Sequence, residues 1–537
     1  MRTHWAIHPF LVGLFPIIFL YAHNAQETSA RELLLPVGVV FVVTFALWLV
    51  LSLVFRSWQK TGLIVSLLLI VFFSSNHLNQ LLNKGLTELS RLWVYQGIEI
   101  KPIYLLATEC LVLVCAAYLI LRKLRRHNEV TNVLNLFSLL LVCMPTASVL
   151  LSMKEAPAAL AHAAPKAPPV LSDALPAGSR PAKLPDIYYI ILDGYARSDK
   201  MRELFGFDNE PFLKCLERRG FYVARESRAN YCQTPLCLAS SLNFQYLDDL
   251  SAVDPQQIPD RLKERIGNNT TASTLKRLGY QFVTFSTGFD QTDHLNADTY
   301  LTPHPNLSAF QWMLLSTTPL ANLTPRQTTV NPYDLARERT LFLLKTLPDV
   351  AKYKAPTFTF AHIICPHPPF VFGENGEDVS PHGKLFQLTD GDQFQRIYGD
   401  RDNYIQGYRN QAIFITKQVD NMIGRILANS PEPPIIILQS DHGSGLGLNI
   451  FCAEKTDLSE RMSILNAYYL PDRGNEHLYQ TITPVNSFRV VLNKYFGGKL
   501  DLLPDQSFYS SWPEPTNFTN VTDDLADKPE KRVSLQR

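Results

Sequence analysis

The chain has 537 residues and a formal net charge of +1 at pH 7, so it is long enough for two or three structural units. Its near-neutral charge gives no electrostatic reason to expect a nucleic-acid partner, which we exclude. Apolar residues are concentrated in the first 153 positions, and the rest has the charge density and Pro/Gly punctuation of a globular domain.

Residues 1–153 are predicted to form a transmembrane domain of about five helices. A span needs roughly 20 largely apolar residues, and the candidate stretches are residues 5–21, 33–55, 61–81, 103–121 and 133–153. The third is the weakest, because its apolar core is short. A signal peptide is the alternative interpretation of the first stretch, because Arg2 precedes it and small residues follow.

Basic residues set the predicted orientation of these spans. They gather in two loops, after the second span (Arg56 and Lys60) and after the fourth (Arg122, Lys123, Arg125 and Arg126). By the positive-inside rule both loops are cytoplasmic, which places the N-terminus inside and everything after Met153 outside. We therefore expect an integral inner- or plasma-membrane protein whose C-terminal domain lies on the outer, periplasmic side.

Glu109 lies inside the fourth predicted span. An intramembrane carboxylate is a candidate functional residue. The alternative, which we favour, is a bundle-facing residue near the outer end of that helix.

Three further segments follow the membrane domain. Residues 154–184 are rich in Ala and Pro and predict an extended, semi-rigid linker. Residues 185–509 form the predicted catalytic domain, and residues 510–537 a polar C-terminal tail.

Strand and helix patterns alternate within residues 185–509. The candidate strands are residues 186–192, 221–225, 280–285, 357–364, 434–439 and 467–470. The candidate helices are residues 210–219, 271–278, 334–347, 406–428 and 485–496. Such alternation predicts an α/β domain with a mostly parallel central sheet and helices on both faces.

Polar side chains stand where these strands end. Asp193 follows one apolar run, Asp441 and His442 follow another, and Thr234 lies on a turn before a helix-like stretch. Parallel sheets bind their ligands at the carboxyl ends of the strands. Two carboxylates, an imidazole and a hydroxyl suit a metal site with a built-in nucleophile, and predict an enzyme acting on phosphate or sulfate esters.

Four segments together resemble a known family. They are Asp-Ile-Tyr-Tyr-Ile-Ile-Leu-Asp-Gly (186–194), Gln-Thr-Pro-Leu-Cys-Leu-Ala-Ser-Ser-Leu-Asn (233–243), Pro-His-Pro-Pro-Phe (366–370) and Ser-Asp-His-Gly (440–443). In order and spacing they resemble the sulfatase-like branch of the alkaline phosphatase superfamily. The closest likeness is to membrane-anchored phosphotransferases such as lipoteichoic acid synthase and phosphoethanolamine transferases, which also carry about five spans before an exported domain.

The resemblance implies that Asp193, Thr234, Asp441 and His442 bind one divalent metal ion (Mn, Zn, Mg or Ca), with Thr234 also the nucleophile. True sulfatases oxidise a Cys or Ser in a Cys/Ser-x-Pro-x-Arg segment to formylglycine. A threonine cannot undergo that reaction, and no Arg occupies the required place after Thr234. Phosphoryl transfer is therefore favoured over sulfate hydrolysis. Cys232 is a rival nucleophile.

Further residues have weaker assignments. His367 could protonate the leaving oxygen or hold a phosphate oxygen, and the alternative is a loop histidine held by its neighbouring prolines. Asn230, Arg197 and Arg461 are candidate substrate-binding residues, against a solvated surface role. We expect His362 to be a buried strand residue rather than a ligand.

Cysteine positions suggest disulfides around the site. Cys232, Cys365 and Cys452 lie within about ten residues of the predicted site segments, close enough to brace its loops in an oxidising compartment. Five cysteines fall in the exported domain, so at least one should remain free or pair intermolecularly.

The leading hypothesis is a membrane-anchored, metal-dependent phosphoryl or phosphoglycol transferase, or a phosphodiesterase, acting on a membrane lipid or envelope glycan. The alternatives are a sulfuric ester hydrolase and a catalytically inactive membrane scaffold. A transporter is disfavoured, because one intramembrane acid and no paired broken spans are visible.

Overall fold

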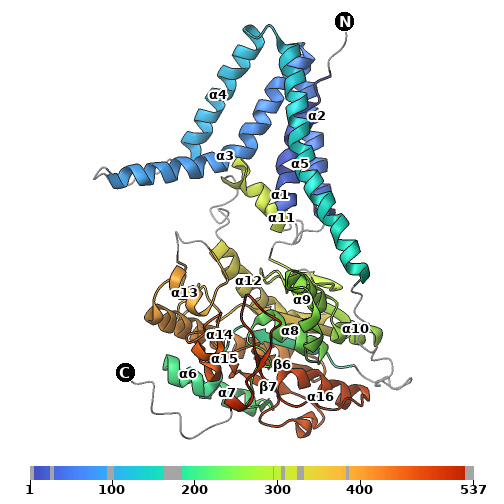
Figure 1. Ribbon diagram of the computed structural model, residues 1–537, viewed down its shortest axis with the longest axis vertical. Coiled ribbons are helices and arrows are strands. Elements are labelled where there is room, and N and C mark those ends of the chain that lie inside the picture. The colour runs from blue at the N-terminus through green and yellow to red at the C-terminus, as the bar shows by residue number, and fades with distance from the viewer. Residues whose placement is uncertain are drawn as a thin grey trace. The chain divides into compact units, whose positions relative to one another are not determined.

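The computed structural model describes residues 5–23, 30–92, 102–162, 184–293, 295–303, 309–322, 332–381 and 386–525 (Figure 1). The chain divides into two compact units. The first comprises residues 1–168 and 304–331, and the second residues 169–303 and 332–537. Residues 304–331 thus group with the N-terminal unit, although the sequence pattern placed them in the catalytic domain.

The first unit is helical. Its five long helices are α1 (His8–His23), α2 (Leu34–Phe55), α3 (Trp58–Leu92), α4 (Pro102–Arg122) and α5 (His127–His162). Each overlaps one of the five expected spans, and α3 and α5 extend beyond theirs at both ends. Among the described residues, three segments are long and apolar enough to cross a membrane: Leu34–Phe55, Trp58–Leu78 and His127–Val149. His8–Ala22 is a shorter apolar helix.

A short helix from the middle of the chain, α11 (Ala309–Ser316), belongs to this unit because its apolar side chains are buried there. Phe310 and Leu314 pack in one cluster with Ile17 of α1 and Val65 of α3. Glu109 of α4 is buried and accepts a hydrogen bond from Ser75 Oγ at 2.9 Å. This contact agrees with a bundle-facing residue.

The second unit is built on a seven-stranded sheet. Its strands are β1 (Ile187–Leu192), β2 (Tyr222–Val223), β3 (Gln281–Phe285), β4 (Thr299–Leu301), β5 (Thr357–Ile363), β6 (Ile435–Gln439) and β7 (Asn466–Tyr469). Their order is β2-β7-β6-β1-β5-β3-β4, and only β7 and β2 pair antiparallel with their neighbours. A two-stranded sheet joins β8 (Phe508–Tyr509) to β9 (Thr519–Asn520). The expected mostly parallel sheet is confirmed.

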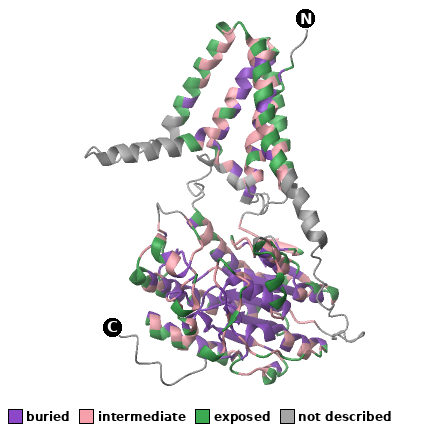
Figure 2. Cartoon of the chain, viewed as in Figure 1, coloured by how far each residue is buried: buried purple, intermediate pink, exposed green. Residues whose placement is uncertain are grey.

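Helices surround this sheet. They are α6 (Ser198–Phe205), α7 (Glu210–Arg218), α8 (Thr234–Asn243), α9 (Ile258–Gly267), α10 (Thr270–Arg277), α12 (Pro332–Thr346), α13 (Gly391–Ile397), α14 (Arg401–Asn429), α15 (Leu458–Met462) and α16 (Pro484–Phe496). Figure 2 shows that buried residues concentrate in the strands and the inner faces of these helices.

The central strand β1 is buried on both sides, which explains its uninterrupted apolar run. Tyr188 and Ile190 pack in a cluster with Ile415 of α14, whereas Tyr189 and Ile191 pack in a second cluster that contains residues of α8 and α16. Complete burial of each large apolar side chain stabilises the fold by about 1.5–3 kcal/mol. Helices therefore cover both faces, as expected, and hold β1 in a fixed register.

That register positions the functional site. Leu192 pairs with Ile363 of β5, and Ile191 pairs with Gln439 of β6. Because β5, β1 and β6 are parallel neighbours, the segments that follow them emerge together at one edge of the sheet.

Candidate active site

The carboxyl ends of β1 and β6 bring Asp193 and Asp441 together. The backbone N–H of Gly194 donates to Asp441 Oδ1 at 3.1 Å, and that of Tyr195 donates to Ser440 Oγ at 2.8 Å. Gly194 adopts a left-handed φ of 71°, which glycine reaches without strain. The two strand ends are thus tied to each other by the turn that follows Asp193.

Thr234 reaches the same point as the first residue of α8, with Pro235 at the next position. A proline in the first turn costs the helix no hydrogen bond, so it favours a helix start at this place. Four side-chain atoms converge there. His442 Nε2 lies 2.9 Å from Thr234 Oγ1, 3.3 Å from Asp441 Oδ2 and 3.6 Å from Asp193 Oδ1.

The His442 ring presents a lone pair to this cluster. Its Nδ1 lies 2.9 Å from the Gly443 carbonyl oxygen, which can only accept, so Nδ1 carries the proton. Burial lowers the pKa of His442 well below its ordinary value, so the ring is neutral and Nε2 accepts from the Thr234 hydroxyl. A backbone carbonyl holding the second ring nitrogen is the usual support of a metal-binding histidine.

Each of the two carboxylates leaves one oxygen free to bind a cation. Asp193 Oδ1 and Asp441 Oδ2 are buried without a hydrogen-bond partner among the described residues. Burial, and next the charge of Asp441, raise the pKa of Asp193 well above its ordinary value. Ligands about 2.0–2.2 Å from a tetrahedral ion lie roughly 3.3–3.6 Å apart. The distances from His442 Nε2 to Asp441 Oδ2 and Asp193 Oδ1 are of this size, whereas the 2.9 Å to Thr234 Oγ1 is that of a hydrogen bond. The two carboxylates and the imidazole are thus spaced as ligands of a divalent ion would be.

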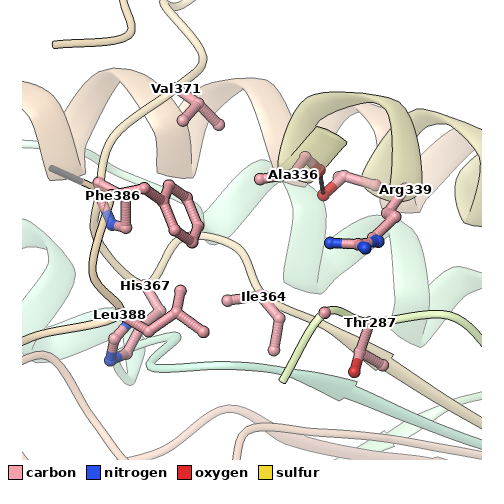
Figure 3. Close-up of a pocket in the computed structure, with 11 residues that line it drawn as sticks. Thr287, Ala336, Arg339, Ile364, His367, Val371, Phe386 and Leu388 are labelled. Atoms are coloured by element: carbon pink, nitrogen blue, oxygen red, sulfur yellow. Dashed lines mark hydrogen bonds between the residues drawn. The ribbon is translucent and has the colours of Figure 1, made fainter. Parts of the chain in front are cut away.

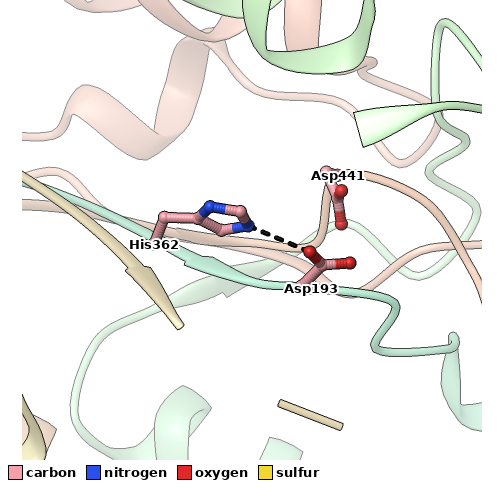
Figure 4. Close-up of side chains that lie close together, drawn as sticks. All are labelled: Asp193, His362 and Asp441. Carbon is pink, nitrogen blue, oxygen red and sulfur yellow. Dashed lines mark hydrogen bonds and ion pairs between the residues drawn. The ribbon is translucent and has the colours of Figure 1, made fainter. Parts of the chain in front are cut away.

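His362 of β5 is buried, as expected, but it also belongs to this cluster. Its Nε2 lies 3.1 Å from Asp193 Oδ2, and its Nδ1 lies 3.0 Å from Thr292 Oγ1. Figure 4 shows the ring directed at the Asp193 carboxylate, with the Asp441 carboxylate beside it. One ligand atom from each of these three residues lies within 4.8 Å of the others.

The contact of His362 favours a supporting role. It faces Oδ2 of Asp193, whereas the unbonded Oδ1 faces His442. His362 therefore fixes the rotation of the carboxylate that would hold an ion. The sequence carried one signal for it, because His362 lies near the end of an expected strand. In the structure that strand, β5, pairs with β1, and its end lies beside the residue before Asp193.

Arg461 is a buried link between three parts of the site, rather than a solvated surface residue. Its Nη1 donates to Asp390 Oδ2 at 2.7 Å and to the Gly443 carbonyl at 3.3 Å, and its Nε donates to the Cys232 carbonyl at 2.9 Å. Only 1% of Arg461 is exposed. It thus joins the segment before Thr234 to the loop after His442.

Asp390 is the partner that sequence reasoning missed. Burial alone would raise the pKa of its carboxyl, but the charges of Arg461 and His367 outweigh burial and lower the pKa to about 2. The local signal was its place as the N-cap of α13, where its side chain accepts from the Gly391 N–H. The Asp390 carboxylate is therefore ionised and forms an ion pair with Arg461.

His367 stands at the border of two cavities. Its Nδ1 lies 2.6 Å from the Pro368 carbonyl, its Nε2 lies 4.0 Å from Asp390 Oδ2, and its ring centroid lies 6.2 Å from that of His442. One cavity, of about 230 Å³, is also lined by Thr234 and His442. A smaller one is lined by Thr287, Arg339 and Phe386 together with His367 (Figure 3).

Asn230 and Arg197 do not line the larger cavity. The Asn230 side chain accepts from the Val485 N–H at 2.9 Å and donates to the Gln506 carbonyl at 2.9 Å. Arg197 makes two 2.8 Å hydrogen bonds to the Asp199 carboxylate. Both side chains therefore have structural partners, and the geometry gives them no contact with a substrate in this cavity.

The expected disulfides are wrong, because all eight cysteines are free. Cys232 is buried, and its thiol contacts the Ser510 carbonyl at 3.4 Å rather than the cavity. Burial raises the pKa of the Cys232 thiol above its ordinary value. A buried, protonated thiol is a poor nucleophile, so Thr234 is favoured over it.

Part of the predicted tail contributes to the site. Trp512 lines the larger cavity, and its backbone N–H donates to the Ile450 carbonyl at 2.9 Å. Gln233 Nε2 donates to the Ser510 carbonyl at 3.1 Å. The residues just after β8 are therefore packed beside Thr234, although their polar composition suggested a loosely held tail.

No protein-family model and no curated protein sequence matches the chain. Among solved structures it is similar to the periplasmic domain of EptC from Escherichia coli (14% identity, TM-score 0.43, covering 67% of this chain and 97% of that one). It is also similar to the lipooligosaccharide phosphoethanolamine transferase EptA from Neisseria meningitidis (13%, 0.38, 91% and 95%) and to BT1596, a 2-O GAG sulfatase (14%, 0.38, 62% and 73%). These are the protein classes that the four sequence segments resemble, and at such values they establish no activity for this chain.

Proposed function

We propose that this protein is a membrane-anchored, metal-dependent phosphotransferase or phosphodiesterase that uses Thr234 as its nucleophile on a lipid or glycan substrate outside the cytoplasm. One observation carries the proposal. At the wall of a cavity, His442 Nε2 lies within 3.6 Å of the Thr234 hydroxyl and of two buried, unbonded carboxylate oxygens. Such a hydroxyl is placed for covalent catalysis.

In this proposal Asp193, Thr234, Asp441 and His442 hold one divalent ion. When bound, the ion would neutralise the carboxylates, lower the pKa of the Thr234 hydroxyl and offset the charge of a phosphoryl oxygen. The candidates are Mn, Zn, Mg and Ca: the carboxylates and the hydroxyl suit all four, and the imidazole suits Zn best.

In the proposed reaction Thr234 is the nucleophile and His367 the general acid. Thr234 Oγ1 loses its proton to solvent and attacks phosphorus, the bond from phosphorus to the leaving oxygen breaks, and His367 gives that oxygen a proton. The phosphoryl group, with its headgroup, is then an ester of Thr234. In the second half of the reaction an acceptor hydroxyl gives its proton to His367 and attacks phosphorus, and the bond from phosphorus to Thr234 Oγ1 breaks. The Thr234 oxygen then regains a proton from solvent. Water as the acceptor would make the protein a phosphodiesterase.

The two alternatives fit the site less well. A sulfatase of this family needs a residue that can become formylglycine, and Thr234 cannot. A scaffold without chemistry would have no use for two adjacent buried carboxylates, each with an unbonded oxygen. Burying two such carboxylates side by side is costly for a fold, and a bound cation accounts for them better than a scaffold role does.

A trapping experiment tests the proposal. The full chain, purified in detergent with each of the four ions in turn, is incubated with a headgroup-labelled phospholipid or an aryl phosphodiester and quenched in acid. We expect a phosphoryl adduct on the peptide that contains Thr234, found by mass spectrometry. An adduct on Cys232, or metal-dependent turnover that never labels Thr234, would refute the assigned nucleophile.

His367→Ala tests the proposed general acid. A positioned acid typically contributes about 10²–10⁴-fold, and mainly when the leaving group is a poor one. We expect kcat for alkyl phosphodiesters to fall at least about 100-fold, and kcat for activated aryl esters to fall far less. The measurement is a parallel kinetic series on both substrates, and equal losses would indicate that His367 binds substrate instead of protonating it.

A further inference from the structure

The turn that leads into Thr234 has little regular structure of its own. Residues 229–233 are buried, but they belong to no helix and to none of the strands of the main sheet. Tyr231 forms an isolated parallel β-bridge with Phe508. Buried backbone groups outside helices and sheets need other partners. The position of this turn therefore depends on the segments that bind it.

A segment that follows α16 along the chain supplies several of these partners. It consists of residues 507–512, which include β8 and which we call the strap. Ser507 Oγ donates to the Ala229 carbonyl at 2.7 Å, and the Phe508 N–H donates to the Asn230 carbonyl at 2.9 Å. The strap thus holds the first half of the turn through two hydrogen bonds to its backbone.

The strap also holds the two residues that directly precede Thr234. Gln233 Nε2 lies 3.1 Å from both the carbonyl oxygen and the Oγ of Ser510. The Ser510 N–H donates to Cys232 Sγ at 3.4 Å. Ser510 is buried, and losing a buried hydrogen bond leaves a polar group unsatisfied. The second half of the turn is therefore costly to move away from the strap.

The other end of the strap is fixed to the loop that follows the proposed ligand His442. The Tyr509 hydroxyl donates to the Asn449 carbonyl at 2.7 Å, and the Trp512 N–H donates to the Ile450 carbonyl at 2.9 Å. Ile450 and Trp512 both line the larger cavity. The strap therefore joins the turn before the proposed nucleophile to the loop after the proposed ligand.

From these contacts we infer that the strap positions Thr234 for attack, and that Ser507, Phe508 and Ser510 are positioning residues of the active site. The inference rests on the proposed function and adds a structural requirement to it. The described residues that line the larger cavity do not include these three, so they act through the turn rather than on the substrate. A nucleophile displaced by about 1 Å can lose roughly 10²-fold in rate.

Two substitutions at one position test the strap in the full chain, purified in detergent. Phe508→Ala removes the ring, whereas Phe508→Pro also removes the N–H that donates to Asn230. We expect kcat for an aryl phosphodiester to be at least about 10-fold lower in Phe508→Pro than in Phe508→Ala, the effect of one lost buried hydrogen bond. KM and bound metal should be alike in the two variants.

Ser507→Ala removes the hydroxyl that donates to Ala229, and it decides the question if Phe508→Pro does not fold. We expect kcat per folded, metal-loaded chain to fall about 10-fold. Ser430→Ala, which removes a hydroxyl that donates to the Ile426 carbonyl at the end of α14, is the matched control and should leave kcat unaltered.

Hydrogen exchange reports on the turn without any substrate. The amides of residues 229–233 should exchange faster in Ser507→Ala and Phe508→Pro than in the unaltered chain, whereas those of β1 should keep their protection. Unaltered exchange in the turn would show that the strap does not hold it.

The outcomes distinguish this inference from the proposed function. A strap that only stabilises the fold would lower the Tm of these variants and leave kcat per folded, metal-loaded chain unchanged. That result would overturn the inference and leave the proposed function standing. If the unaltered chain turns over without ever labelling Thr234, the proposed function itself fails, and the inference fails with it.

Discussion

Thr234→Ala should abolish turnover, with kcat reduced by at least about 10⁴-fold, the scale of loss when a covalent nucleophile is removed. The variant keeps Asp193, Asp441 and His442, so it should still bind the ion, more weakly. Acid quenching should trap no phosphoryl adduct. Because α8 begins at Thr234 without using this side chain as its N-cap, the fold should survive the change.

Two further variants sharpen this result. Thr234→Ser retains a hydroxyl at the same place and should retain a trappable adduct. Thr346→Ala, at the end of α12 and outside both cavities, is the matched control and should behave as the unaltered chain. A Thr234→Ala protein that turns over at an undiminished rate would mean that water or another side chain attacks the phosphorus.

The sheet and the convergence of the four proposed ligands could be predicted because their signals are local. A strand that is buried on both faces shows a continuous apolar run, as Ile187–Leu192 does, and ligands gather where such strands end. The structure brings Asp193, Thr234, Asp441 and His442 together, as the sequence pattern suggested. Their roles as ligands and nucleophile remain proposals.

The contacts that support the cluster could not be predicted, because they join residues far apart in the chain. The Asp390–Arg461 pair spans 71 positions, and the His362–Asp193 contact spans 169. Neither pair has a periodic signature. In the sequence, Arg461 looks like any charged residue on a short helix. Its burial results from tertiary packing, which the local sequence does not reveal.

The placement of α11 was missed for a different reason. Its apolar residues give no indication of which hydrophobic cluster they join, and a position between β4 and β5 along the chain suggested the catalytic domain. The structure packs Phe310 and Leu314 with residues of α1 and α3. Local hydrophobicity predicts that a segment is buried, but not which core buries it.

Asp441→Asn should lower bound metal and turnover together. The change keeps the shape of the side chain and an oxygen that can accept from the Gly194 N–H, but removes the negative charge at Oδ2. We expect elemental analysis to find well below one ion per chain, and kcat to fall in proportion. Asp349→Asn, which breaks an exposed pair with Lys352, is the matched control, because such surface pairs contribute little.

Thermal unfolding gives a second readout that does not depend on activity. An ion present at about 100 times its Kd stabilises the native state by about 2.7 kcal/mol, so the unaltered chain should show a raised Tm with the ion and Asp441→Asn should not. Without the ion, Asp441→Asn should be no less stable than the unaltered chain. Asp193 and Asp441 repel each other across the buried site, and removing one charge relieves that repulsion. Metal-free Asp441→Asn should therefore unfold at the same temperature as the metal-free unaltered chain, or higher.

An Asp441→Asn variant that binds a full complement of metal and turns over normally would show that the ion is held elsewhere.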